Sequence, residues 1–146
     1  MNKYKYILLA TDFTKTAETA AKRASELAAC DNARLCLLHV IEHFPGDLPN
    51  NWIAPEDHDP TSYLTERSMK ALEQLGSQLN YDNIETRIIL SEHSAAHEIT
   101  QYAKQNKVEL IVTGYPVRHG ITNVFGSTSC AVLHLAECDT LSVQSS

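Results

Sequence analysis

The sequence is poor in basic residues and has no long hydrophobic run. Its 146 residues contain 12 Lys and Arg against 18 Asp and Glu, giving a formal net charge of −6. Nucleic-acid-binding proteins and polybasic membrane-surface proteins need the opposite balance, because both neutralise anionic groups. The apolar run near the start, Tyr6–Ala10, is much shorter than a membrane-spanning helix of about 20 residues or the core of a secretory signal. We therefore expect neither a nucleic-acid partner nor a membrane partner.

Cysteine is also sparse, and no two cysteines have the spacing of a metal or redox motif. The four cysteines are Cys30, Cys36, Cys130 and Cys138. Such scattered residues are typical of reduced thiols in a cytosolic protein. The length suits one domain, residues 1–146, with a core that needs no disulfide or metal for stability. We expect a soluble, cytoplasmic, single-domain protein without a metal site.

The hydrophobic pattern alternates between two periods along the chain. Short, mostly apolar segments predict strands, and segments with apolar residues on one helical face predict helices. The expected strands are Tyr4–Ala10, Arg34–Ile41, Ile84–Leu90, Val108–Gly114 and Thr140–Val143. The expected helices follow capping residues at Thr14, Asp59 and Ser94, the third spanning His97 to about Asn106, and a fourth runs from Gly126-Ser127-Thr128 through Ala136.

Strands that alternate with helices favour a parallel sheet covered on both faces. In such folds ligands bind beyond the carboxyl ends of the strands, where the winding reverses. In this sequence those ends are Asp12 after the first strand, Val40 to Glu42 in the second, and Gly114 after the fourth. We expect any binding site to be formed by these three places.

The strongest local signal is the glycine-bearing segment between the fourth strand and the fourth helix. A Gly-Ser-Thr sequence at a helix start offers backbone N–H groups, two hydroxyls and the positive end of the helix dipole, which suit a phosphate. Arg118 could add one positive charge. The alternative is a structural connection in which Gly114 turns the chain and a hydroxyl caps the helix. The residues concerned are Gly114, Arg118, Gly120, Gly126, Ser127 and Thr128.

Asp12 has two interpretations as well. It lies where the first strand gives way to the first helix, so its carboxylate could hold a magnesium ion or ribose hydroxyls in the crevice. Alternatively, it accepts hydrogen bonds from the N–H groups at the start of the helix near Thr14.

Together these residues resemble the universal stress protein family, in its universal stress protein A-like branch. The similarity covers nearly the whole chain and is carried by YILLATDFT, LCLLHVIE and VTGYPVRHGITNVFGSTSCAVLHLAECDTLSV. The last segment is similar to the family's G-S-H-G-R-H-G-(x)5-G-S-T stretch. The resemblance implies a three-layer α/β/α fold of the adenine-nucleotide alpha-hydrolase-like type, with a five-stranded parallel sheet of order 3-2-1-4-5. It also implies a homodimer in which the final strands of two chains pair.

The resemblance further implies a nucleotide site in the crevice. Some family members bind ATP there, with Mg²⁺ as the accompanying ion; others bind no nucleotide and act as stress-linked dimers. Two hypotheses follow: a non-enzymatic stress-response dimer, and an ATP-binding member with slow hydrolysis. In the binding members the residue matching Asp12 faces the nucleotide and backbone at Val40 meets the adenine. The implied contacts to ribose and phosphates are Gly114, Arg118, Gly120, Gly126, Ser127 and Thr128.

One stretch departs from the ATP-binding pattern. Val117 stands where the family carries a second glycine, and Tyr115-Pro116 replaces a small residue and a histidine. Valine is disfavoured at positive φ, and proline removes an N–H donor. If the loop needs an unusual backbone at residue 117, phosphate contact is weakened, so the sequence leaves nucleotide binding open.

Other features have simpler interpretations. His93 and His97 lie four residues apart, a spacing that can present two metal ligands, but no acid stands in the zinc-protease position between them. We assign them a surface or capping role, and we expect His39 to be a hydrogen-bonded residue rather than a catalytic base. The proline-rich segment from Glu42 to Pro60, with Trp52, is either a lid over the crevice or a disordered excursion.

Overall fold

Strands and helices alternate along the described part of the chain, as the hydrophobic pattern predicts. The structure is a computed structural model and describes residues 3–42, 54, 56, 59–115 and 127–144. The segment with Trp52 and the loop with Arg118, Gly120 and Gly126 therefore lie outside the described residues. The elements are β1 Tyr6–Ala10, α1 Lys15–Asp31, β2 Arg34–Glu42, α2 Pro60–Gln78, β3 Ile84–Ser91, α3 Ala95–Gln105, β4 Leu110–Tyr115, α4 Ser127–Leu135 and β5 Asp139–Gln144.

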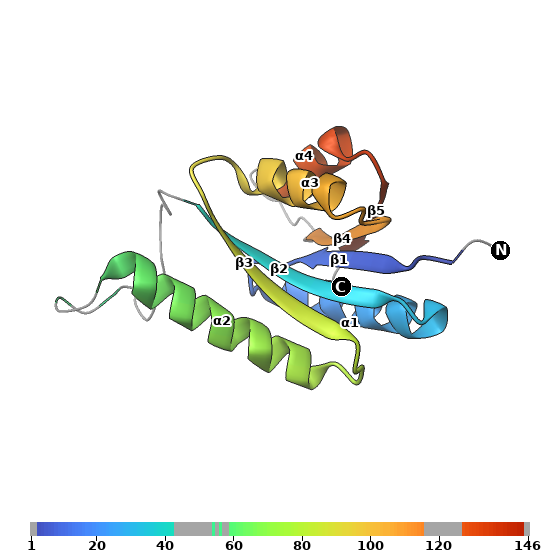
Figure 1. The fold of residues 1–146 in the computed structure, drawn as a ribbon, viewed down its shortest axis with the longest axis horizontal. Helices are drawn as coiled ribbons and strands as arrows, with labels where there is room; N and C mark the ends of the chain where they lie inside the picture. Colours follow the sequence, from blue (N-terminus) through green and yellow to red (C-terminus); the bar gives the residue numbers. More distant parts are fainter. Residues whose placement is uncertain (1–2, 43–53, 55, 57–58, 116–126, 145–146) are drawn as a thin grey trace, which may run out of the picture.

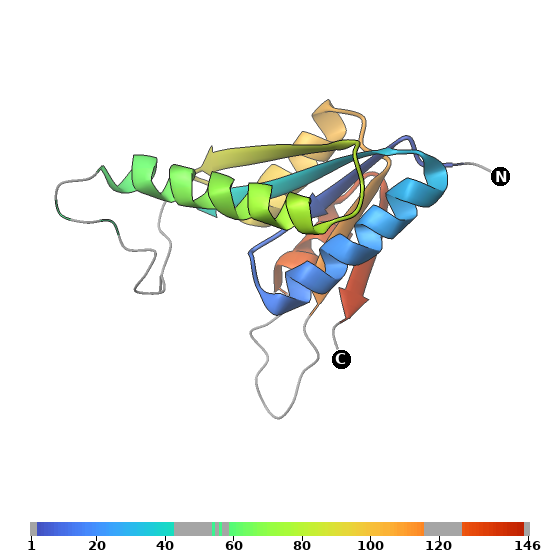
Figure 2. The same cartoon turned by 90° about the horizontal axis from the view of Figure 1, so that it is seen from below.

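The five strands form one parallel sheet in the order β3-β2-β1-β4-β5. Helices α1 and α2 cover one face and α3 and α4 the other (Figure 1). Figure 2 shows α1 and α2 side by side across their face. The predicted three-layer fold and strand order are confirmed. None of the described helices is long and apolar enough to cross a lipid bilayer.

The core is built around β1, the central strand. Ile7 and Leu9 point to the layer of α1 and α2, and Leu8 points to the layer of α3 and α4; all three are fully buried. The side of α1 that meets the sheet is a stripe of alanines with no exposed surface, Ala20, Ala21, Ala24 and Ala28. Because alanine is small, α1 approaches the strands closely, as its pattern predicts.

The predicted helix caps are confirmed. The Thr14 hydroxyl accepts a hydrogen bond from the N–H of Ala17, and the Asp59 carboxylate accepts one from Ser62. The Ser94 hydroxyl accepts one from the N–H of His97. These bonds satisfy N–H groups that have no partner within the helix.

Several boundaries differ from prediction for local reasons. β1 begins at Tyr6 rather than Tyr4, because the N–H of Tyr4 is donated to the Asp31 carboxylate instead of a strand partner. α3 begins at Ala95 rather than His97, directly after its cap. β4 begins at Leu110, since the N–H of Val108 still bonds the Ala103 carbonyl at the end of α3. β2, β3, β5 and α4 agree with prediction within one residue at each end, and α1 and α2 begin directly after their predicted caps.

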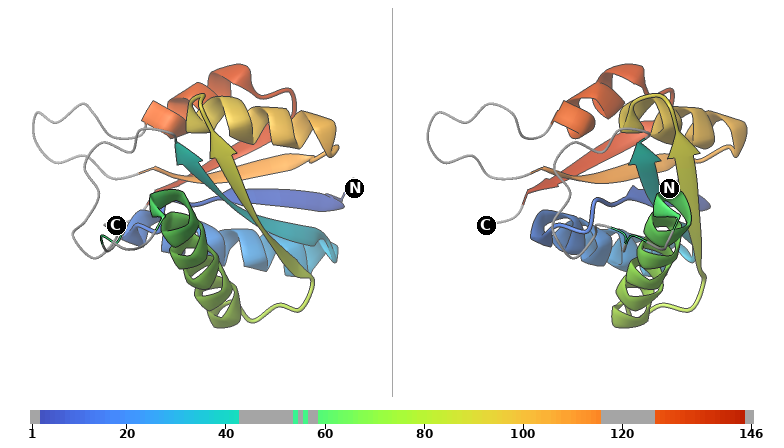
Figure 3. Two further views of the ribbon diagram at one scale, coloured as in Figure 1. Left: turned by 60° about the vertical axis from the view of Figure 1, so that its left-hand side comes forward. Right: turned by 90° about the vertical axis from the view of Figure 1, so that its left-hand side faces the viewer.

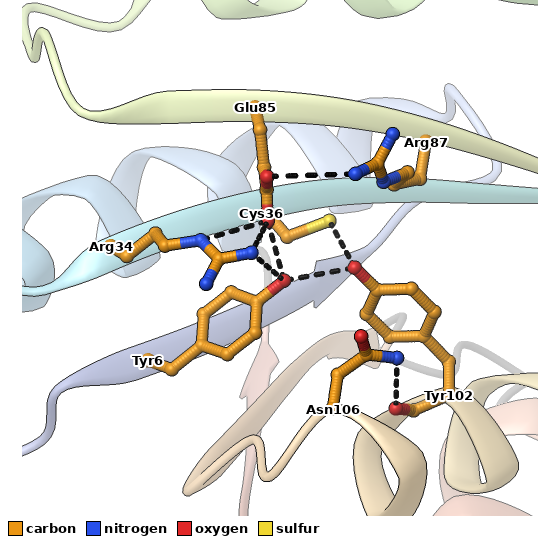
Figure 4. Close-up of polar contacts among 7 residues, drawn as sticks. All are labelled: Tyr6, Arg34, Cys36, Glu85, Arg87, Tyr102 and Asn106. Carbon is orange, nitrogen blue, oxygen red and sulfur yellow. Dashed lines mark hydrogen bonds and ion pairs between the residues drawn. The ribbon is translucent and has the colours of Figure 1, made fainter.

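The amino ends of β1, β2 and β3 carry a polar cluster that the sequence pattern does not reveal (Figure 4). Tyr6 donates a hydrogen bond of 2.5 Å to Glu85 Oε1, and the Arg34 guanidinium reaches the same oxygen at 2.8 Å. The guanidinium also stacks 4.0 Å above the Tyr6 ring. Burial would raise the pKa of Glu85, but the hydrogen bonds from Tyr6 and Arg34 outweigh it and lower that pKa. Glu85 is therefore ionised and anchors the cluster.

A second tyrosine closes this cluster from α3. The hydroxyl of Tyr102 lies 2.8 Å from that of Tyr6 and accepts a weak hydrogen bond from the Cys36 thiol at 3.7 Å. Burial raises the pKa of Cys36 to about 11, so the thiol stays protonated at neutral pH. Its neutral, enclosed state makes Cys36 an inert core residue rather than a nucleophile.

One buried hydroxyl leads to a prediction about stability. Within the described residues Ser68 Oγ has no hydrogen-bond partner, although the side chain is 1% exposed. Ser68→Ala removes a desolvated polar atom and introduces a better helix former, so we expect it to stabilise the fold by about 1 kcal/mol. Urea denaturation measures the change in unfolding free energy.

Ser25→Ala is the matched control for this substitution. Ser25 also lies within a helix and is also buried, but its hydroxyl donates to the Lys22 carbonyl at 2.8 Å. Because both changes share the gain in helix propensity, only the Ser68 variant should show the additional stabilisation. Equal effects of the two substitutions would contradict an unsatisfied hydroxyl at Ser68.

Candidate functional site

A cleft of about 510 Å³ lies at the carboxyl ends of the strands. The strands' arrowheads point to this side of the molecule (Figure 3). Four of the predicted residues line the cleft: Asp12, Val40, Gly114 and Thr128. Ser127 is the first residue of α4, and nothing of its side chain is described; Arg118, Gly120 and Gly126 lie outside the described residues. The described half of the predicted set therefore converges on one place.

Asp12 takes the structural role that was predicted for it, and its side chain also lines the cleft. Its Oδ1 accepts a hydrogen bond from the Thr14 N–H at 3.1 Å and another from the Thr14 hydroxyl at 2.6 Å, so the carboxylate helps to begin α1. The same exposed side chain lines the cleft. The structural interpretation is thus confirmed, and it places the carboxylate where a ligand would meet it.

The β1–α1 turn contains a backbone conformation that sequence reasoning missed. Phe13 has φ 65°, a left-handed value that is rare for a bulky residue. Its N–H is held by the Thr11 hydroxyl at 3.0 Å, and its ring packs against the ring of His39 with centroids 4.4 Å apart. A local hydrogen bond and a tertiary ring contact thus accompany this conformation, which the sequence pattern does not predict.

His39 supports this turn from β2. Its Nδ1 lies 2.7 Å from the Thr11 carbonyl oxygen, so Nδ1 carries the proton and donates. Burial lowers the pKa of His39, against smaller opposing effects of the Thr11 carbonyl and the Asp12 charge. The ring is therefore neutral at pH 7. His39 is the hydrogen-bonded residue that the sequence analysis expected, and it fixes the backbone next to Asp12.

Gly114 lines the cleft, but it does not make the turn that its structural interpretation predicted. It lies within β4 rather than at a turn, and its φ is not in the left-handed region. A Cβ at this position would come within 2.9 Å of the Thr16 side chain and 3.0 Å of the Thr16 carbonyl oxygen. Glycine is needed here because β4 passes directly against the first turn of α1.

Three hydroxyls link the floor of the cleft to the edge of the sheet. Thr113 Oγ1 on β4 lies 2.6 Å from Ser129 Oγ on α4, and Ser129 Oγ lies 2.9 Å from Ser142 Oγ on β5. Thr113 and Ser129 both line the cleft and are buried. Sequence reasoning missed this chain, because the hydroxyls come from three separate elements.

The described walls of the cleft are neutral or acidic. Asp12 and Glu42 line it, and no Lys or Arg does so among the residues that the structure describes. Tyr115, the last residue of β4, is not one of the described lining residues, so it does not fill the space. In the described chain no three His, Cys, Asp or Glu side chains gather as a metal centre. The walls thus offer hydroxyls, backbone groups and the carboxylates of Asp12 and Glu42.

Comparison with known proteins decides the family. The model of the universal stress protein family matches residues 3–144. The chain belongs to the universal stress protein family. A relative in Coxiella burnetii, universal stress protein A homolog 2, is 35% identical over 145 residues, which are 99% of this chain and 97% of the relative. The solved universal stress protein UspA from Lactobacillus plantarum superposes with a TM-score of 0.73 at 24% identity, covering 98% of this chain and 99% of that one.

Two further solved family members contain adenine nucleotides. One universal stress protein, in complex with cAMP, has a TM-score of 0.62 at 18% identity, covering 97% of this chain and 98% of the other. The universal stress protein from Archaeoglobus fulgidus, in complex with dAMP, has a TM-score of 0.64 at 16% identity, covering 97% and 99%. These likenesses establish the adenine-nucleotide alpha-hydrolase-like fold for this universal stress protein.

The contact between Gly114 and α1 can be tested by substitution. Gly114→Ala places a methyl group against the Thr16 backbone, which cannot move aside easily, so we expect a loss of about 1–3 kcal/mol of unfolding free energy. Thermal or urea denaturation measures it.

Gly76→Ala is the control. A Cβ at Gly76, within α2, meets only side-chain atoms at 3.6 and 3.9 Å, which is ordinary contact. Because alanine is the better helix former, this change should raise stability by about 0.5–1 kcal/mol. A Gly114 variant as stable as the wild type would show that β4 and α1 do not touch as described.

Proposed function

We propose that this universal stress protein, of the A-like type, binds an adenine nucleotide in the cleft at the carboxyl ends of the strands. One observation carries the proposal: Asp12, Val40, Gly114 and Thr128 come from four separate segments and line the same space of about 510 Å³. Such a volume suits a small-molecule ligand. The cleft lies where β2 and β4 flank β1 on opposite sides, which is the reversal point that ligands favour in this class of sheet.

The chemistry of the walls suits the parts of a nucleotide. Ala10, Val40 and Ile99 provide an apolar surface for a planar base, and the backbone of Val40 would meet the adenine edge. Thr128, in the first turn of α4, offers its hydroxyl and a helix amino end to an anion. Asp12 would accept ribose hydroxyls or hold Mg²⁺. Arg118, Gly120, Gly126 and Ser127 complete the proposed set from the loop before α4.

The proposed role is binding rather than turnover. Among the described lining residues we assign no pair of nucleophile and base, and we give His39 a structural role, since its Nδ1–H is donated to the Thr11 carbonyl and its ring packs against Phe13. The cAMP and dAMP complexes of other family members support an adenine nucleotide as the ligand class. We infer a stress-response protein in which the fraction of clefts occupied by nucleotide follows the nucleotide concentration. We do not assign ATP hydrolysis to it.

Isothermal titration calorimetry tests this proposal. Purified protein is titrated with AMP, cAMP and ATP plus Mg²⁺, and we expect at least one Kd tighter than about 100 μM. Asp12→Asn should weaken binding about tenfold, equivalent to about 1.4 kcal/mol, since a charged acceptor of the ligand is lost. Asp82→Asn, at an exposed position after α2, should leave binding unchanged.

A third variant examines the altered glycine loop. Val117→Gly restores the family's glycine, and a tighter Kd would show that valine weakens phosphate contact. Absence of binding to all three nucleotides, in the wild type and in this variant, would reject the proposed ligand.

We also propose a homodimer through the edge of the sheet at β5. β5 pairs with β4 on one side, and an unpaired edge strand invites a second strand. The adjoining helix α4 exposes two large apolar side chains, Leu133 at 60% and Leu135 at 52%. Pairing two β5 strands about a two-fold axis would satisfy the edge and cover this apolar surface.

Light scattering coupled to size exclusion tests the dimer. The wild type should have twice the mass of the chain at micromolar concentration, and the double substitution Leu133→Asp with Leu135→Asp should shift it toward the monomer. Leu90→Asp is the control, because Leu90 is 54% exposed but lies on β3, at the opposite edge. A monomeric wild type, or a dimer broken by the Leu90 variant instead, would contradict pairing at β5.

A cytoplasmic location and a single domain complete the proposal. Cys30, Cys36, Cys130 and Cys138 are all free thiols, which fits a reducing compartment. The family match spans nearly all of residues 1–146, so we infer one universal stress protein domain.

A further inference from the structure

The two histidines at the start of α3 lie close together on the surface. The ring centroids of His93 and His97 are 4.9 Å apart, with the ring planes inclined at 52°. Both residues are exposed. Neighbouring serines fix their backbones: the N–H of His93 donates to Ser91 Oγ at 2.8 Å, and that of His97 donates to Ser94 Oγ at 3.2 Å. The chain therefore holds the two imidazoles near each other before any ligand arrives.

Their separation matches the requirements of a shared metal ion. An imidazole nitrogen lies about 1.1–1.2 Å from the ring centroid and binds a divalent transition metal at about 2.0–2.1 Å, which places the ion about 3.2 Å from each centroid. The two ring centroids are 4.9 Å apart. The lines from the ion to the two centroids therefore meet at an angle of about 100°. This value lies between the right angle of octahedral coordination and the tetrahedral angle.

We propose that His93 and His97 form a surface site for a divalent transition-metal ion such as Ni²⁺ or Zn²⁺. Two imidazoles supply the protein ligands, and water completes the coordination. Imidazole is a ligand that these ions prefer, whereas Mg²⁺ and Ca²⁺ prefer oxygen. A two-histidine site of this kind is compatible with the finding that no three potential ligands cluster in the described chain.

The local charge has two opposing contributions. The amino end of α3 carries a partial positive charge, which opposes a cation. The exposed carboxylate of Glu92 next to His93 and the Glu98 carboxylate in the first turn of α3 offset it. The chain's net charge of −6 also favours cation binding. The electrostatic environment therefore does not prevent the site from filling.

The metal site is separate from the proposed nucleotide cleft. Ala95 and Ile99 mark the side of α3 that lines the cleft. Residues two positions apart point to nearly opposite sides of a helix, so His97 lies away from that side. The ligands proposed for the cleft and the ion proposed here would thus bind independently, and failure of one proposal leaves the other intact.

Calorimetric titration with Ni²⁺ tests the site. Cu²⁺ is avoided because it would oxidise the exposed thiols of Cys30 and Cys130. The wild type should bind one Ni²⁺ with a Kd in the micromolar range. His93→Asn and His97→Asn should each weaken this binding at least about tenfold, because a chelate becomes a single-imidazole contact. His134→Asn is the matched control, since His134 is an exposed histidine on α4 without a described histidine beside it, and it should bind like the wild type.

A second measurement locates the ion. Paramagnetic Ni²⁺ broadens amide resonances near its site, so signals of residues around His93 and His97 should disappear first and return on addition of EDTA. The proposal is overturned if the wild type shows no binding below millimolar Ni²⁺. It is equally overturned if binding survives unchanged in both histidine variants, or if the broadening centres on another part of the chain.

Discussion

Close contact between α1 and the sheet is the constraint on which the rest of the structure depends. The alanine stripe of α1 and the missing side chain at Gly114 allow the first turn of α1 to touch β4. Because α1 directly follows β1, this contact fixes the turn that carries Asp12 relative to β4. The position of the Asp12 carboxylate at the cleft is therefore set by packing between small residues of α1 and β4.

The two ends of the sheet use polar residues differently. At the amino ends, Tyr6, Arg34, Glu85 and Tyr102 bond one another and close the space between strands and α3. At the carboxyl ends, the polar groups of Asp12, Thr113 and Thr128 surround an open volume. The polar groups at the amino ends thus lie in a closed cluster, whereas those at the carboxyl ends also border the cleft. This difference is why the candidate site lies at the carboxyl ends of the strands.

Much of the fold is visible in the sequence because it follows from local rules. The cap residues Thr14, Asp59 and Ser94 and the alternating apolar periods predict the order of the elements, and the family resemblance supplies the strand order. The local pattern and the family resemblance also named the residues of the candidate site. Those that the structure describes as lining the cleft are Asp12, Val40, Gly114 and Thr128. The sequence could not reveal the left-handed backbone of Phe13, the bond from His39 to Thr11 or the role of Gly114. Each of these features involves contact between residues distant in the chain. For Gly114, the local sequence is as compatible with a turn as with a strand that lies against α1.

The hydroxyls of Thr113, Ser129 and Ser142 have a mechanical consequence. Ser129 is bonded to β4 on one side and to β5 on the other, so α4 cannot slide over the sheet without breaking two buried or half-buried hydrogen bonds. Ser129 therefore couples one wall of the cleft to the edge strand β5. A displacement of that strand would strain these bonds and so act on the wall of the cleft.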